Sequence, residues 1–580
     1  MRRMAAVLAT LVFAVAFAQG CGSRPPTPSA GSGDGAFRQL SAEILNYFYK
    51  HNPTRATDLG IHKYDDVIED YSAAGVKADS QAIRSFRDRL DSVDPQALTL
   101  EAQLDLEQVK HTLDSWLLGD DVIRRWAKDP DLYSSGITEA AYVMIKRSFA
   151  PPEQRLKSLI ARLKLMPNVL AEARKNLDNP PKVYTEIAID QLDGNRDFFA
   201  TAVPEAFSDV TDAGLLAELK TATAAVVSGL DEYKRWLQDD LLQRSNGSFA
   251  YGSATYQNVL AADEMITTSL GELLTIAEAD LNRNQQAFVE TAQKVDPAKA
   301  PTQVLADVQQ DSPPASQLLT RTQSELDSLA QFVRDHKIVT IPPAPPAQVK
   351  ETPPFLRATT SASMDTPGPF ETVATEAYFD MTLPDPTWPQ QEQDDFMKQW
   401  YYAAISNVSV HEVWPGHYLQ FLYAKTFPSD IRKVFGASSN IEGWAHYVEQ
   451  MMLDEGLHAD DPRYRLAQIQ DALLRDVRLI VGIKMHTQGM TVEQAQEMFV
   501  KDAYQPDPVA ESEGRRGTSD ATYGYYTMGK LMILKLRDDY KAKMGAEYSL
   551  QGFHDAFIKL GPLPLPLIRK AMLGEVGNPF

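Results

Sequence analysis

The sequence predicts a mainly α-helical protein with a small β element, and three observations lead to this fold class. Apolar residues recur at steps of three and four from Phe37 to about residue 335, the spacing of one buried helix face. Proline and β-forming residues are concentrated in one internal stretch, 339–389. The helical pattern then resumes and continues to the end. With 44% hydrophobic residues, the 580-residue chain can fill a large core, which excludes a wholly disordered protein.

The N-terminus has the features of a bacterial lipoprotein signal. Arg2 and Arg3 precede the apolar stretch Ala5–Ala18, and small residues lead to Cys21. Such signals are cut before the cysteine, which is then acylated. We therefore expect residues 1–20 to be a signal peptide and the protein to be held in the cell envelope by a lipid on Cys21, facing the periplasm or the exterior. An ordinary secretory signal with an incidental cysteine is the alternative.

The rest of the chain divides by composition. We expect no later membrane span, since no apolar run approaches the ~18 residues that one needs. Helical patterns precede and follow the Pro-rich stretch, which is either a linker or a strand-like insert, with a short strand or two in Phe370–Thr382. We expect a flexible Gly/Ser/Pro tether at 21–36, an N-terminal helical region at 37–338, the insert at 339–389 and a second helical region at 390–580, with 37–580 forming one unit that contains a cleft.

Charge and cysteine content exclude several classes of function. The chain has 57 Lys and Arg against 78 Asp and Glu, a net charge of −21. Nucleic acid is excluded as a partner, because its binding depends on cationic side chains. A single cysteine excludes disulfides and thiolate metal clusters within the chain.

Two histidines and a glutamate fall within the seven residues His411-Glu412-Val413-Trp414-Pro415-Gly416-His417. Neutral imidazole is a good zinc ligand, and a carboxylate beside the metal can accept a proton from water. Six steps along a regular helix separate the two histidines by about 120°, so one helix would not aim both at one ion. Pro415 and Gly416 lie between them and can kink the backbone. The alternatives are a capping box at Ser409-x-x-Glu412 and histidines without a metal.

A second polar cluster begins 25 residues after His417. Glu442, His446 and Glu449 are spaced at i, i+4 and i+7, so they share one stripe of a helix. The spacing allows a first helix to end and a second to return beside it, which would make Glu442 the third ligand. Two histidines, one glutamate and an open position are the donor set of catalytic zinc. A solvated helix face with a capping box at Ser439-x-x-Glu442 is the alternative.

The motifs HEVWPGHYLQ and EGWAHYVE resemble the signature pair of the domain-of-unknown-function 885 family, which includes many bacterial lipoproteins. The resemblance covers most of the chain, because Pro53, Ala56, Thr57, Gly60, Ile61, His62, Tyr64, Asp65, Asn176-Leu177 and Pro180-Pro181 are similar to other family patterns. It implies an elongated helical fold of the zincin type, similar to zinc-dependent peptidases such as angiotensin-converting enzyme and thimet oligopeptidase. It further implies that His411, His417 and Glu442 hold Zn²⁺ and that Glu412 is the general base.

Two more catalytic candidates come from the same resemblance. Tyr526-x-x-Gly529 resembles a late family motif, and its phenol would donate a hydrogen bond to an oxyanion, unless it belongs to an aromatic packing cluster. His486 resembles another family position, although the family often has an acid four residues earlier, where this chain has Gly482. A core or surface histidine is the alternative there. For Glu449, a solvated carboxylate is preferred over a role in orienting a ligand.

The function that follows is zinc-dependent hydrolysis of peptide bonds in small peptides. Zinc would activate a water molecule, Glu412 would transfer its proton and Tyr526 would stabilise the oxyanion. We also expect the strand-like segment Thr372–Thr382 to pair with an extended peptide substrate by edge addition. A zinc amidase acting on a non-peptide substrate, a non-catalytic peptide-binding lipoprotein and a structural envelope protein are the alternatives.

Overall fold

The computed structural model describes residues 31–353, 357 and 360–580. Most of these residues are in helices, and the strands among them form one small sheet, so the mainly α-helical prediction with a small β element is confirmed. The predicted signal peptide, Cys21 and most of the predicted tether lie outside the described residues.

The first helix, α1 (Asp34–His51), begins inside the segment predicted to be a tether. The Asp34 carboxylate accepts hydrogen bonds from the backbone N–H and the hydroxyl of Thr99, both at 3.0 Å. This contact with a distant segment holds the first turn in place. Composition alone does not reveal it, since Gly33 to Ala36 has little apolar character.

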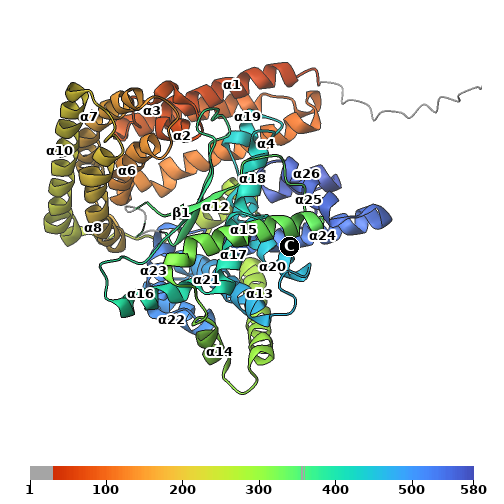
Figure 1. The fold of residues 1–580 in the computed structure, drawn as a ribbon. Coiled ribbons are helices and arrows are strands. Elements are labelled where there is room, and N and C mark those ends of the chain that lie inside the picture. Colours follow the sequence, from red (N-terminus) through yellow and green to blue (C-terminus); the bar gives the residue numbers. More distant parts are fainter. Residues whose placement is uncertain (1–30, 354–356, 358–359) are drawn as a thin grey trace, which may run out of the picture.

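The helices up to residue 244 form two groups (Figure 1). In Figure 1, α1, α3 and α4 run along the top, while α6, α7, α8 and α10 stand together at the left. The bounds are α2 (Pro53–Asp58), α3 (Ala73–Asp91), α4 (Leu100–Leu118), α5 (Arg125–Lys128), α6 (Asp131–Ile145), α7 (Pro152–Asn176), α8 (Lys182–Asp197), α9 (Val203–Glu205), α10 (Ala213–Trp236), α11 (Leu242–Arg244), α12 (Ser253–Glu264), α13 (Leu270–Val295), α14 (Pro301–Val308) and α15 (Leu318–Asp335).

Most helices after the Pro-rich stretch form the middle and lower part of the molecule together with α13 and α15, while α19 lies beside α4 at the top (Figure 1). Most of them share the largest core cluster with α12 to α15, so the middle and the C-terminal part of the chain contribute to one core. Their bounds are α16 (Gln390–Met397), α17 (Tyr402–Glu412), α18 (His417–Ala424), α19 (Asp430–Val434), α20 (Ser438–Asp454), α21 (Pro462–Thr487), α22 (Val492–Asp502), α23 (Asp507–Ser519), α24 (Tyr525–Met544), α25 (Leu550–Lys559) and α26 (Leu565–Leu573).

One helix among the described residues, Ala213–Arg244, is long and apolar enough to cross a membrane by length and composition. This differs from the expectation that no such run follows the signal. Leu219, Val226 and Leu230 of this helix are buried in one core cluster with α6, α7 and α8. An amphipathic helix in the core of a globular protein has the same composition, and this packing accounts for it.

The small sheet is built from strands β1 (Gln348–Glu351), β2 (Ala362–Asp365) and β3 (Tyr378–Met381), in the order β1-β3-β2. β3 is parallel to β1 and antiparallel to β2. The Pro-rich stretch is therefore partly strand, and Phe370–Thr382 contains a strand only at its end. Glu371 explains the difference, because its carboxylate accepts the N–H groups of the next three residues and removes them from any strand ladder.

The expected pairing of a peptide with Thr372–Thr382 is wrong. β3 lies between β1 and β2, so both of its edges are already hydrogen-bonded, and the free edges of the sheet belong to the other two strands.

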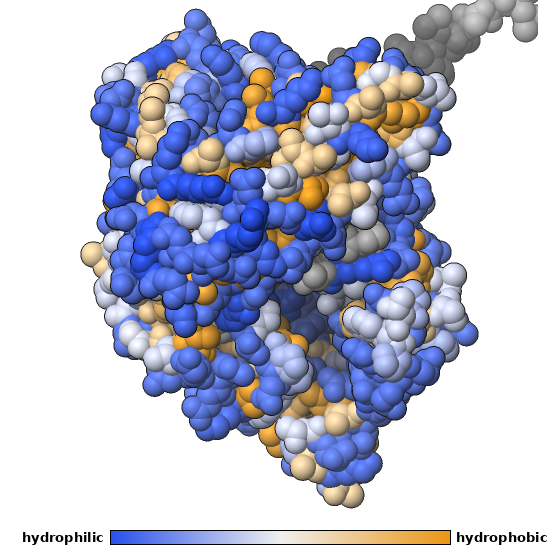
Figure 2. Space-filling view, turned by 90° about the vertical axis from the view of Figure 1, so that its left-hand side faces the viewer, coloured by the Kyte–Doolittle hydropathy of each residue, from blue (hydrophilic) through white to orange (hydrophobic). Residues whose placement is uncertain are grey.

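The surface of one side of the molecule is mostly hydrophilic (Figure 2). Figure 2 shows apolar residues there only in small groups, and it shows a hollow near the centre of this side. Below the surface, α20 packs against α17, α18, α21 and α24. This set of packed helices carries the polar residues described next.

Candidate metal centre

His411, His417 and Glu442 lie together, and each offers one ligand atom within 4.8 Å of the others. Nε2 of His411 is 3.6 Å from Oε2 of Glu442, and Nε2 of His417 is 3.4 Å from the same oxygen. The two imidazole rings are perpendicular, with centroids 4.8 Å apart. Both histidines are buried, and Glu442 is partly buried. Two imidazole nitrogens and a carboxylate oxygen that converge in this way can hold a metal ion.

A break in the helix between the two histidines allows both side chains to point toward one position. His411 lies in the last turn of α17, and His417 is the first residue of α18. A Cβ on Gly416 would meet the carbonyl oxygen of His411 at 1.7 Å, so only glycine allows the two helix ends to approach this closely. The indole of Trp444 donates a hydrogen bond of 2.8 Å to the carbonyl of Pro415 and fixes this break to α20.

Both capping-box alternatives are wrong. Ser409 lies within α17, and Glu412 is the last residue of that helix. At the start of α20, the backbone and hydroxyl of Ser439 donate to the buried carboxylate of Glu264 in α12, and Glu442 takes no part. The N-terminus of α20 is therefore capped by a side chain that is remote in sequence.

Glu449 is buried, so its interpretation as a solvated carboxylate is wrong. Its Oε1 accepts from Nδ1 of His411 at 2.6 Å, and its Oε2 contacts Nδ1 of His446 at 3.1 Å. Arg475 from α21 reaches Oε1 at 3.1 Å. The carboxylate thus holds the His411 ring so that Nε2 points toward Glu442.

Within this cluster of His411, Glu449 and Arg475, neighbouring opposite charges counteract the effect of burial on the pKa values. Burial opposes ionisation of Glu449, but Arg475 and the neighbouring histidines outweigh it and hold the pKa of Glu449 well below its usual value. Burial likewise acts to lower the pKa of His411, but the carboxylates of Glu442 and Glu449, which accept hydrogen bonds from the ring, overcome this effect and raise the pKa to about 9.

A cavity of about 570 Å³ meets the candidate metal ligands at His411, and Glu412 and Tyr526 also line it. Glu412 follows the candidate ligand His411 directly in sequence and lines the same cavity. The remaining lining residues come from the segment that leads into β2, from the turn before α17, and from α17, α21 and α23. They are Arg357, Thr360, Ser361, Ala362, Trp400, Asn407, Val408, Asp471, Arg475, Arg478, Ser512, Glu513 and Arg516.

Tyr526 reaches the cavity because α24 and α20 pack at very short range. A Cβ on Gly529 would meet the carbonyl oxygen of Ser439 at 1.9 Å, which explains the glycine three residues after the tyrosine. The Tyr526 ring stacks on His411, with centroids 6.3 Å apart. Burial and the Glu442 carboxylate raise the pKa of Tyr526, so its phenol keeps its proton and can donate a hydrogen bond.

His486 is not part of this group. It lies eleven residues beyond Arg475 in α21, about 16 Å along the helix, and it does not line the cavity. Its Nε2 contacts the carbonyl of Gly517 at 2.9 Å, and its ring packs against Tyr251. His486 is therefore a histidine of the core, as in the alternative interpretation. The missing acid has a steric reason, because a Cβ on Gly482 would lie 2.6 Å from the carbonyl oxygen of Ala521.

Sequence reasoning missed the polar residues that α21 and α23 contribute to the cavity. No role is predicted from the sequence for Arg475, Arg478 or Arg516, which all line the cavity. One signal is present in the sequence, since Asp471, Arg475 and Arg478 are spaced at i, i+4 and i+7 and share one side of α21.

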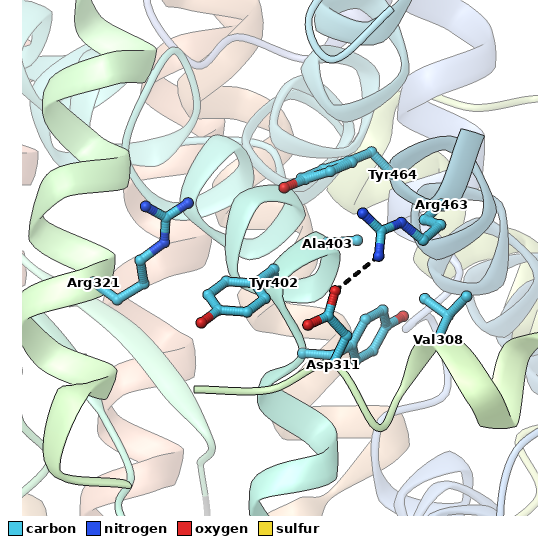
Figure 3. Close-up of a pocket in the computed structure, with 8 residues that line it drawn as sticks. Val308, Asp311, Arg321, Tyr402, Ala403, Arg463 and Tyr464 are labelled. Carbon is cyan, nitrogen blue, oxygen red and sulfur yellow. Dashed lines mark hydrogen bonds and ion pairs between the residues drawn. The ribbon is translucent and has the colours of Figure 1, made fainter. Parts of the chain in front are cut away.

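A second cavity, of about 320 Å³, lies at the other end of α17 (Figure 3). Tyr402, Tyr464 and Arg321 line it, and Figure 3 shows Arg463 engaged with Asp311, a contact of 2.8 Å. Tyr402 is nine residues from His411, about 14 Å along the helix. This cavity has no set of metal-ligating residues among its lining, so it is separate from the candidate centre.

Comparisons with other proteins agree with this architecture. The chain is similar to the solved structure of a predicted lipoprotein of unknown function from Shewanella oneidensis, with 26% identity and a TM-score of 0.78 over 93% of this chain and 99% of the other. A predicted lipoprotein from Colwellia psychrerythraea matches at 18% identity with a TM-score of 0.81, over 94% and 99% of the two chains. The curated proteins give no match. The model of the family described as "Bacterial protein of unknown function (DUF885)" matches residues 53–572, so the chain belongs to that family.

Proposed function

We propose that this protein is a zinc-dependent hydrolase that cleaves peptide bonds in small peptides. The observation that carries the proposal is the convergence of His411, His417 and Glu442 within 4.8 Å, with Glu412 lining the adjoining cavity. Two histidines and one glutamate form the protein part of a catalytic zinc site. The donor set of this chain fits that ion, because Glu449 occupies Nδ1 of His411 and leaves Nε2 available.

The residues of the cavity divide the chemistry between them. Zinc bound there would supply a Lewis acid that lowers the pKa of water and polarises a carbonyl oxygen. Glu412 accepts the proton that the attacking water loses and gives it to the leaving amine. The protonated phenol of Tyr526 donates a hydrogen bond to the oxyanion that develops on the substrate. Glu449 acts through His411, whose ring it holds in place.

The cell envelope is the proposed location. The lipoprotein-type signal ahead of Cys21 supports it, and so do the two structural relatives, which are described as predicted lipoproteins. Labelling of cells with a fatty-acid analogue tests this location, since Cys21→Ser should abolish incorporation.

The Glu412→Gln variant tests the function most directly. We expect it to bind one zinc per chain like the parent protein and to lose at least about a hundred-fold in peptide turnover, because the amide cannot accept a proton. Metal analysis and cleavage of a mixed peptide library provide the two measurements. Glu455→Gln is the matched control, since Glu455 is exposed just beyond the end of α20. Full activity of Glu412→Gln would refute the assigned base.

A further inference from the structure

Four arginines line the cavity beside the candidate metal centre, against three carboxylates, Glu412, Asp471 and Glu513. The lining therefore carries one net positive charge, counted from these residues, in a chain whose total charge is −21. Such a local excess is unexpected for an acidic protein, and a cavity lined in this way attracts anions.

Two of these arginines are held rigidly by carboxylates of the protein. Nε and Nη2 of Arg478 donate to Glu513 at 2.7 and 2.6 Å, and the same two nitrogens of Arg516 donate to Asp520 at 3.1 and 2.8 Å. In both cases Nη1 has no hydrogen-bond partner within the described part of the chain. A guanidinium that is fixed on one side loses little side-chain entropy when its remaining N–H groups bind a ligand. This favours binding of a planar anion.

The two guanidinium groups lie against the same tyrosine ring, and Arg478 also lies near the candidate metal centre. Both lie over the ring of Tyr523, at 5.9 Å for Arg478 and 5.6 Å for Arg516. Arg478 is also 5.3 Å from the ring of Tyr526, which is 6.3 Å from the ring of His411. Arg478 is thus within about 12 Å of the first ligand, a distance that an extended peptide covers in about three or four residues.

We propose that Arg478 and Arg516 bind a carboxylate of the substrate and so select peptides that carry this group within about four residues of the cleaved bond. This inference rests on the proposed function, because that function is what identifies the substrate as a peptide. The carboxylate is either the peptide's C-terminus or an acidic side chain, and the chemistry of recognition is the same for both. Both arginines are specificity-determining residues.

The test measures binding rather than turnover, in zinc-loaded Glu412→Gln protein. The probes are an N-acetylated hexa-alanine with a free C-terminus, its C-terminal amide, and amide forms with one glutamate at each position in turn. We expect at least one carboxylate-bearing probe to bind about ten-fold or more tightly than the neutral amide. Preference for the free C-terminus identifies the terminal carboxylate, and preference for one glutamate position identifies a side chain.

Arg516→Gln should remove this preference by weakening binding of the preferred carboxylate-bearing probe to the level of the neutral amide. Arg478→Lys should reduce the carboxylate preference, because lysine keeps the positive charge but lacks the two parallel N–H donors of a guanidinium. Arg515→Gln is the matched control, since Arg515 pairs with Asp190 and does not line the cavity. Arg516 is partly exposed, so its variant remains informative even where Arg478→Lys fails to fold.

Equal binding of neutral and carboxylate-bearing probes by the parent protein would overturn the inference, and so would a preference that survives Arg516→Gln. Its failure is distinguishable from failure of the proposed function. Peptide cleavage without a carboxylate preference would contradict the inference alone. A protein that selects carboxylate-bearing probes and cleaves no peptide would contradict the function alone.

Discussion

The orientation of His411 depends on one buried carboxylate, Glu449, which lies 2.6 Å from Nδ1 of the ring. Replacing it by glutamine should weaken zinc binding about ten- to a hundred-fold, the usual cost of losing an outer partner of a metal-bound histidine. Competition with a chromogenic chelator measures this affinity. Exposed Glu455 provides the control variant, Glu455→Gln, for which we expect parental affinity. Zinc affinity that does not change in Glu449→Gln would show that the ring needs no such support.

The same substitution leaves Arg475 without its full partner, so folding must be monitored alongside affinity. Arg475 is largely buried and also lies over the ring of Tyr526, at 5.4 Å. A lowered melting temperature is therefore expected as well. Zinc affinity has to be referred to the folded fraction at the temperature of the titration.

At the level of elements, α20 depends on a cap supplied by α12. No residue of its own caps this helix, and the buried Glu264 accepts the hydrogen bonds of Ser439 instead. Burial raises the pKa of Glu264 to about 8. An acid whose pKa is higher in the folded state contributes stability below its unfolded value of about 4.5, and this contribution is lost as the pH rises through 8.

Glu264→Gln isolates this contribution, because glutamine resembles the protonated acid. We expect the variant to melt within a few degrees of the parent near pH 5, and to lose less stability than the parent between about pH 5 and about pH 9. Glu272→Gln, at an exposed position in the first turn of α13, serves as the control and should follow the parent. Parallel melting curves for parent and Glu264→Gln would contradict the raised pKa.

For the molecule as a whole, a buried arginine joins the N-terminal helices to the C-terminal helical region that contains the candidate metal centre. Arg432 in α19 is almost fully buried, and its Nε donates to Asp105 in α4 at 2.6 Å. Nη1 donates to the carbonyl of Leu560 at 3.0 Å. Around it, Phe435 packs on Phe48 from α1, with ring centroids 5.3 Å apart.

Arg432→Met should cost about 3 to 5 kcal/mol of folding stability, because it leaves Asp105 buried without its partner. Calorimetry or denaturant unfolding measures this loss. Arg465→Met is the control, since Arg465 pairs with a partly exposed Asp454 and should change stability by at most ~1 kcal/mol. Zinc affinity of folded Arg432→Met should equal that of the parent; a loss of metal binding by folded protein would place Arg432 in the site.

Helical content and the candidate ligands were predictable because they depend on short-range patterns. Apolar residues at helical spacing require one buried face, and His411, His417 and Glu442 were found from residue type and spacing alone. The break between the histidines was anticipated from Pro415 and Gly416, although its extent was not. Glycine at position 416 shows the reason, since the nearest atom to its missing Cβ belongs to a ligand residue.

The sequence by itself determined the helical class, the membership in a family through its motifs and the three residues that can hold a metal ion. Only the tertiary structure decided that Glu449 is buried against His411, that His486 lies elsewhere, that β3 has no free edge and that Arg478 and Arg516 share one cavity. The physical reason is that burial, strand order and the packing of α21 against α23 depend on contacts between different segments of the chain. The spacing of residues within one segment does not determine such contacts.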